Sequence, residues 1–76
     1  MKLPLISGKE LVKLLAKLGY EVDHQTGSHI ILRNRVSPYR RTTVPNHAEI
    51  ARPTLAEIIR QIGLSREEFL KMYNNF

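Results

Sequence analysis

The stretch Gly27-Ser28-His29-Ile30-Ile31-Leu32-Arg33 decides the fold, because it is the most apolar and β-branched run in the middle of the chain. Such a run is typical of a strand, in which successive side chains point to opposite faces of the sheet. Ile30 and Leu32 therefore face one way, and we expect them to lie in the core. His29 and Arg33 face the other way. The sequence thus predicts a histidine and an arginine on one exposed face of a central strand.

Two further strands are predicted, one on each side of this run. Residues 20–24 alternate between apolar and polar, and residues 25–27 can close a hairpin into the central strand. A proline-containing loop over residues 34–39 follows it. Residues 40–44 then form a third strand, which Pro45 ends because proline cannot donate to a sheet ladder. The economical topology is a three-stranded antiparallel meander.

Three Ser/Thr-x-x-Glu patterns predict where three helices begin, since the N-cap side chain and the glutamate satisfy each other's backbone N–H groups. The patterns are Ser7–Glu10, Thr54–Glu57 and Ser65–Glu68. Apolar residues at helical spacing follow each pattern, and Gly19 and Gly63 are expected to end the first two helices. The predicted order is αβββα plus a short C-terminal helix. This is an α+β fold with helices packed on one face of the sheet.

Length and composition limit the class of protein. The chain has 76 residues and no cysteine, and no apolar run approaches the ~20 residues of a membrane span. This length predicts one small domain over residues 1–76 with a thin core, because such a chain buries only about 60% of its unfolded surface. The lack of cysteine favours a reducing compartment, and the N-terminus has no signal-peptide core. We expect a cytoplasmic protein that does not contact membranes.

Most of the net charge of +5 comes from residues 24–48, which contain four arginines and no acidic residue. These are Arg33, Arg35, Arg40 and Arg41. The planar guanidinium group suits the oxygen atoms of phosphate. This arrangement favours a nucleic-acid partner. Charge alone leaves a plain solvated surface as the alternative.

An ordered set of motifs resembles the HicA toxins of bacterial and archaeal toxin–antitoxin systems. The motifs are Leu3-Pro4, Ser7-Gly8-Lys9-Glu10-Leu11, Gly19-Tyr20, Gly27-Ser28-His29, Val44-Pro45-Asn46-His47, Thr54-Leu55, Ile59-Arg60-Gln61-Ile62-Gly63-Leu64-Ser65 and Glu68-Phe69. The resemblance covers nearly the whole chain. It has two departures: Pro53 stands where the family often has glycine, and Ile30 follows His29 where the family often has a second histidine or a polar residue.

The resemblance implies a fold like a double-stranded RNA-binding domain. It also implies a metal-independent endoribonuclease that cleaves mRNA and inhibits translation and growth, an mRNA interferase, with no cofactor. A HicB-type antitoxin would neutralise the toxin in a hetero-oligomer. The resemblance identifies His29 as the catalytic residue and gives His47 a secondary role in the site.

Metal-free RNA cleavage needs a base for the 2′-hydroxyl proton and donors for the developing charge on the phosphorane oxygens. Histidine changes charge near neutral pH, so it can act as this base or protonate the leaving 5′-oxygen. Arg33 and Arg41 are candidates for stabilising the charge. Gly27 and Ser28 are candidates for positioning a phosphate or the ring of His29. For Gly27, however, a turn with positive φ is the first expectation.

The predicted RNA-binding residues are Ser28, Arg33, Arg35, Arg40, Arg41 and Lys9. Lys9 also belongs to a row of helix lysines that plain solvation would explain. Two other functions stay open: a non-catalytic RNA-binding module, and a domain that serves only to bind the antitoxin. A zinc site built from the three histidines is disfavoured, because their spacing matches no ligand pattern. Serine-hydrolase chemistry lacks an acid to orient a histidine.

Overall fold

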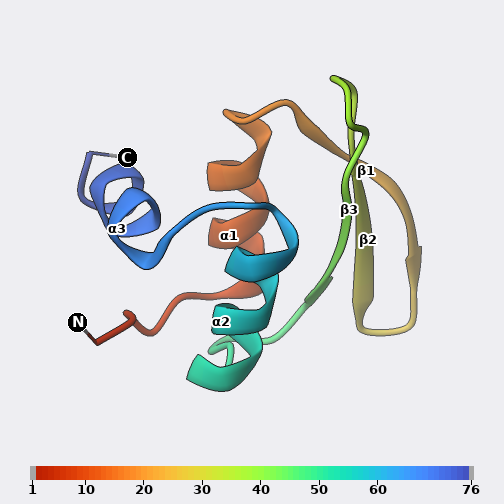
Figure 1. Ribbon diagram of the computed structural model, residues 1–76. Coiled ribbons are helices and arrows are strands. Elements are labelled where there is room, and N and C mark those ends of the chain that lie inside the picture. The colour runs from red at the N-terminus through yellow and green to blue at the C-terminus, as the bar shows by residue number, and fades with distance from the viewer. Residues whose placement is uncertain (1, 76) are drawn as a thin grey trace.

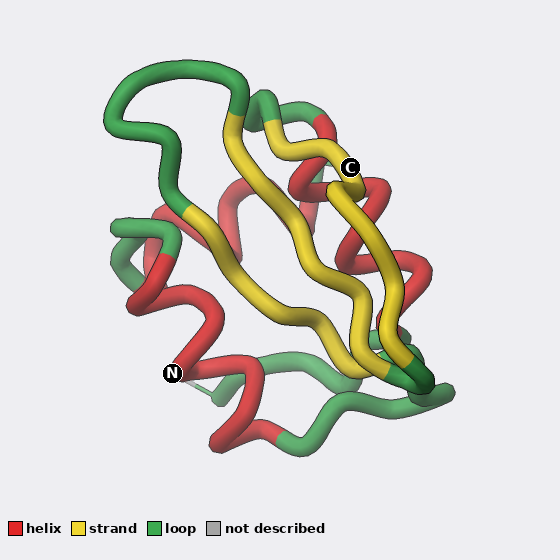
Figure 2. The backbone as a smooth tube through the Cα atoms, turned by 90° about the vertical axis from the view of Figure 1, so that its right-hand side faces the viewer, coloured by secondary structure: helices red, strands yellow, loops and turns green. Residues whose placement is uncertain are grey.

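The computed structural model describes residues 2–75 and has the predicted α+β architecture. The elements are α1 (Gly8–Ala16), β1 (Tyr20–Thr26), β2 (His29–Asn34), β3 (Arg41–Pro45), α2 (Arg52–Gln61) and α3 (Arg66–Asn74). The strands form one antiparallel sheet in the order β1-β2-β3. Figure 1 shows α1 and α2 against one face of the sheet and α3 on the far side of these helices. None of the described helices covers the other face, which is turned to the viewer in Figure 2.

The central strand β2 alternates as its sequence predicts. Ile30 and Leu32 are buried under the helices, whereas His29 and Arg33 are exposed on the uncovered face. The apolar positions of α1 and α2 complete the core from the other side. The fully buried side chains are Leu11, Leu14, Leu15, Leu32, Val44, Ile50, Leu55 and Phe69.

The β1–β2 hairpin turns over two residues, Gly27 and Ser28, since Thr26 pairs with His29. Gly27 has φ of 58°, so the expected positive φ is present. Positive φ at Gly27 but not at Ser28 is the signature of a type II′ turn, which matches the twist of the flanking strands. The turn therefore begins two residues later than predicted, and β1 is correspondingly longer.

Two of the three predicted capping boxes are present, at α1 and α3. The amide of Glu10 donates to Ser7 Oγ at 3.1 Å, and the amide of Ser7 donates to Glu10 Oε1 at 3.2 Å. The same reciprocal pair joins Ser65 and Glu68. Hydrogen bonds from the backbone and side chain of Ser65 lower the pKa of Glu68. These boxes fix the start of both helices.

The third capping box, at Thr54, was a wrong prediction. Helix α2 begins at Arg52 with Ala51 as its N-cap, and no side chain caps it. Pro53 occupies the first turn, where its missing N–H is not needed and its fixed φ suits a helix. The helix therefore starts before Thr54. Glu57 instead accepts hydrogen bonds from the Arg60 guanidinium, which lower its pKa.

The helix ends differ in detail. Helix α1 ends at Ala16, and Gly19, with φ of 94°, closes a turn after it instead of following the helix directly. Gly63, with φ of 77°, directly follows the C-cap of α2. The amide of Gly63 donates to the carbonyl of Arg60, and the amide of Leu64 donates to the carbonyl of Ile59. These two bonds form a Schellman motif, as expected for a C′ glycine.

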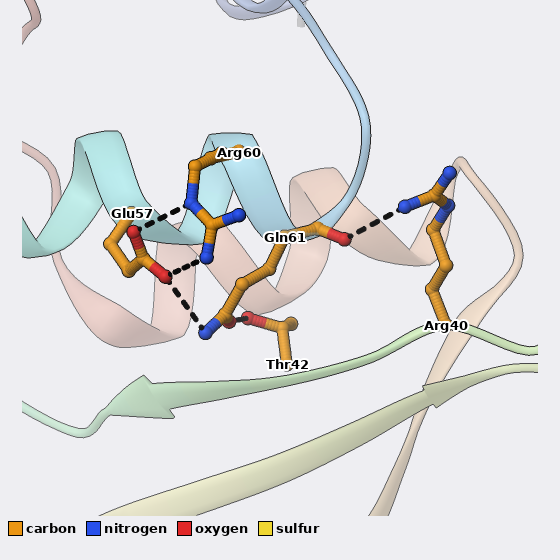
Figure 3. Close-up of polar contacts among 5 residues, drawn as sticks. All are labelled: Arg40, Thr42, Glu57, Arg60 and Gln61. Carbon is orange, nitrogen blue, oxygen red and sulfur yellow. Dashed lines mark hydrogen bonds and ion pairs between the residues drawn. The ribbon is translucent and has the colours of Figure 1, made fainter.

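Polar contacts tie the end of α2 to β3 (Figure 3). Thr42, which is buried, donates from Oγ1 to Gln61 Oε1 at 2.7 Å. Arg40 donates from Nη1 to the backbone carbonyl of Gln61 at 3.3 Å. A basic side chain at this place also suits the negative end of the helix dipole. These contacts hold α2 at a fixed position along the edge strand.

Candidate active site and nucleic-acid interface

His29 and His47 line one hollow at the edge of the sheet, where β3 leads into α2. The hollow has a volume of about 440 Å³. His29 is paired with Pro45 on the neighbouring strand, so both side chains lie on the same face. The other lining residues are Thr43, Pro45, Ala51 and Thr54. The fold thus brings together two exposed imidazoles from distant parts of the sequence.

The segment that carries His47 is held by backbone hydrogen bonds. The carbonyl of His47 accepts from the amide of Gly8 at 2.9 Å, and the amide of Asn46 donates to the carbonyl of Ser28 at 2.6 Å. The amide of Ile50 donates to the carbonyl of Ile6 at 2.8 Å. These bonds join the segment to the start of α1 and to the hairpin turn next to His29.

Gly8 makes this junction possible. A Cβ atom at Gly8 would lie 2.2 Å from the carbonyl oxygen of Pro45 and 3.0 Å from the Cα of Asn46. Only a residue without a side chain allows the two backbones to approach so closely. Sequence analysis did not single out Gly8, because the signal depends on a contact between distant segments.

A second hollow, of about 340 Å³, adjoins the first at His47. It is also lined by Ser7, Lys9, Asn46 and Ala48. Lys9 therefore lies at the same end of the sheet as the two histidines. A larger hollow of about 580 Å³ lies elsewhere, around Lys2 and Arg52. It has no side chain that titrates near neutral pH, so it is not the candidate for acid–base chemistry.

Arg33 and Arg41 lie opposite each other on β2 and β3 at the other end of the uncovered face. Four residues of strand, about 13 Å, separate Arg33 from His29. Side chains stand roughly perpendicular to a sheet. The two arginines therefore lie at the opposite end of this face from His29. This position gives no support to the expectation that they stabilise the phosphorane.

The remaining predicted residues are dispersed. Arg35 lies in the β2–β3 loop, with its Nε 3.7 Å from Glu21 Oε2, and both side chains are exposed. Arg40 is directed to the carbonyl of Gln61 at the end of α2 (Figure 3). Ser28 is exposed in the hairpin turn next to the hollow. The structure thus groups the histidines with Lys9 at one end, and two arginines at the other.

Two threonines of the hollow were missed by sequence analysis. Thr43 shares the uncovered face because it pairs with Ile31 of β2, a register that alternation alone does not provide. Thr54 was assigned to an N-cap, and it lies instead in the exposed first turn of α2. Both hydroxyl groups are able to donate to a phosphate oxygen.

Within residues 2–75, no helix has the length and apolar character needed to cross a bilayer. In the same part of the chain, no three His, Cys, Asp or Glu side chains come together as metal ligands do. The three histidines are therefore not arranged as a zinc site.

Comparison with known proteins identifies the family. No curated protein and no solved structure matches the chain. The family model described as "HicA toxin of bacterial toxin-antitoxin" matches residues 8–64, which is well over half of the chain. The matched segment runs from Gly8 to three residues past the end of α2, and it includes His29, His47 and the four arginines of residues 24–48. This chain belongs to the HicA toxin family of bacterial toxin–antitoxin systems.

Proposed function

We propose that this toxin is a metal-independent endoribonuclease that cleaves mRNA, with His29 as the catalytic residue and His47 as its partner. The observation that carries the proposal is that both imidazoles line one exposed hollow. RNA cleavage by attack of the 2′-hydroxyl needs two proton transfers, and two histidines can supply both.

In this reaction one imidazole takes the proton from the 2′-hydroxyl, and the 2′-oxygen attacks the adjacent phosphorus. The bond from phosphorus to the 5′-oxygen breaks, and the second imidazole, in its protonated form, gives a proton to that oxygen. The products are a 2′,3′-cyclic phosphate and a 5′-hydroxyl. Thr43 and Thr54 line the same hollow as the histidines and Lys9 lines the adjoining one, so these three are our candidates for stabilising charge on the phosphate oxygens.

The uncovered face of the sheet would bind the rest of the RNA. Like charges directly opposite each other on neighbouring strands destabilise a sheet, and Arg33 and Arg41 are such a pair. Glu21 of β1 lies opposite Arg33 on its other side and partly offsets this repulsion, and a phosphate between the two arginines would offset it further. Ser28 and Arg35 extend the surface at its two ends. Arg40 keeps guanidinium donors beyond the one that it gives to α2, so it also contributes charge to this surface.

A HicB-type antitoxin would neutralise the toxin in a hetero-oligomer by covering the face that bears His29 and Arg33. Steric occlusion is the simplest mechanism, because the candidate site is open and built on the surface. We place this activity in the cytoplasm, where mRNA is translated.

The decisive experiment replaces His29 with alanine and measures cleavage of labelled mRNA in the presence of EDTA. Loss of a general acid or base should lower the rate by about 10² to 10⁴. The thermal melt should change little, because surface substitutions usually alter stability by less than about 0.5 kcal/mol. The His47→Ala variant should also cleave the labelled mRNA more slowly than wild type. His24→Ala is the matched control, since His24 is an exposed histidine of β1 that bonds only to Asp23 among the contacts described.

Normal cleavage by a folded His29→Ala variant would exclude His29 from catalysis. Binding of RNA by the wild-type protein without any cleavage would favour the alternative, a non-catalytic RNA-binding module of the same fold.

A further inference from the structure

The loop between β2 and β3, residues 35–40, is fixed in its backbone but exposes its side chains. The amide of Asn34 donates to the carbonyl of Arg40 at 2.9 Å and closes the base of the loop. Asn34 also donates from its side chain to the carbonyl of Leu18 and accepts from the amide of Val36. The amide of Tyr39 donates to the carbonyl of Val36 at 2.8 Å. Even so, 62% of the surface of both Val36 and Tyr39 is exposed.

Tyr39 has a conformation that does not suit its side chain. Its φ is 58°, in the left-handed region, which asparagine and glycine adopt more readily than an aromatic residue does. The exposed ring contributes nothing to the core that would offset this strain. Asparagine at this position would therefore make the fold more stable than tyrosine does. An aromatic ring held out in a strained turn points to a role in binding.

The surroundings of Tyr39 favour a nucleic acid as the ligand. The loop carries Arg35 and Arg40 and leads back into Arg41, and residues 24–48 contain no acidic residue. Glu21 of β1 is the acidic side chain placed against this end of the sheet, through its 3.7 Å contact with Arg35. An exposed aromatic ring beside cationic side chains is the usual platform for an unpaired base.

We propose that Tyr39 stacks on an unpaired base of single-stranded RNA and so makes single-stranded segments the preferred substrate. This inference rests on the proposed ribonuclease function. From His29 to the end of β2 the sheet is about 17 Å long. A single strand with its reacting phosphate at His29 would pass the Arg33–Arg41 pair and reach Tyr39 with a later base. A duplex keeps its bases stacked inside and presents none to the ring.

The test compares the binding of a short fluorescent RNA by wild type, Tyr39→Asn, Tyr39→Phe and Val36→Ala. Methylation of every 2′-hydroxyl removes the nucleophile, so binding is measured without cleavage. Tyr39→Asn should lower the affinity about 5- to 150-fold, the range for loss of one stacked base. It should melt at or above the wild-type temperature, because asparagine accepts this φ better. Tyr39→Phe keeps the ring and should bind normally. Val36→Ala is the control for an equally exposed side chain without a ring.

The salt dependence separates stacking from charge. Tyr39→Asn should leave the slope of log affinity against log salt unchanged, whereas Arg35→Gln should reduce it by about 0.7, the value for one phosphate on a single strand. The inference is wrong if Tyr39→Asn binds single-stranded RNA normally while the wild type still cleaves mRNA. The inference is also wrong if Tyr39→Asn weakens the binding of duplex RNA as much as that of single-stranded RNA. It is equally wrong if Tyr39→Asn loses affinity for the antitoxin but not for RNA. If the wild-type protein neither binds nor cleaves RNA, both the proposed ribonuclease function and the inference on Tyr39 fail.

Discussion

Replacing Gly8 with alanine should destabilise the protein, because the new Cβ would lie 2.2 Å from the carbonyl oxygen of Pro45. Such contacts essentially never come below 3.0 Å, and the opposing atoms belong to the backbone. The two segments must therefore separate. Separation would stretch the 2.9 Å bond from the Gly8 amide to the carbonyl of His47 and the 2.8 Å bond between Ile50 and Ile6.

The expected cost follows from three terms. Overpacking costs about 1–3 kcal/mol, and a weakened backbone hydrogen bond adds about 1 kcal/mol. Alanine is preferred to glycine in a helix by at most about 1 kcal/mol, which opposes these costs. The three terms leave a net loss of about 1–4 kcal/mol in the free energy of unfolding, with a central value of about 2–3 kcal/mol. For a domain of this size that lowers the melting temperature by roughly 10–20 °C.

Circular dichroism melts of Gly8→Ala and Gly27→Ala would measure this effect. Gly27 is the matched control, because a Cβ there meets nothing within 4 Å and only its φ of 58° opposes alanine. Positive φ costs an L-residue about 1–3 kcal/mol here, but no neighbouring segment has to move, so the control should lose stability without displacement of the His47 segment. Gly8→Ala should also cleave RNA more slowly even well below its melting temperature, since the His47 segment is displaced. A Gly8→Ala protein that melts within a few degrees of wild type would refute the close-approach argument.

Two further predictions concern the antitoxin and acid stability. In the complex, hydrogen exchange should be slowed at the β2 amides around His29 and Arg33, and an unprotected face would exclude simple occlusion. The pKa of Glu68 is lower in the folded state than in the unfolded chain, so its contribution is present above pH 4.5 and is lost as the pH falls through the folded pKa. Glu68→Gln should therefore be less stable than wild type at pH 7. The difference between their urea midpoints should shrink at pH 3. If the difference stays the same, the stabilising role assigned to the ionised Glu68 side chain is wrong.

The local parts of the fold could be predicted from the sequence. The alternation in β2 correctly placed Ile30 and Leu32 in the core and His29 on the exposed face. The boxes at Ser7 and Ser65 correctly placed two helix starts, since each depends on residues only three positions apart. The start of α2 was wrong because Pro53 suits the first turn of a helix and moves its start ahead of Thr54.

The grouping of the site could not be predicted, because it depends on contacts between distant segments. The convergence of His29 and His47 requires the backbone bonds that join three separate parts of the chain. Arg40 and Arg41 are neighbours in sequence, yet Arg40 is held by the carbonyl of Gln61 at the end of α2. Charge counting treats both alike, and only the tertiary structure separates them.

The way in which the His47 segment is anchored has a consequence for how this toxin can diverge. Its three anchoring bonds, through Asn46, His47 and Ile50, all use main-chain atoms. The side chains of residues 46–49 are therefore not needed to hold the loop, and mutations there are largely neutral for folding. Selection can then alter the proposed active site one substitution at a time, while Gly8 and the buried Ile50 must remain constant. Tolerance to mutation and a position in the proposed site thus coincide in one short loop.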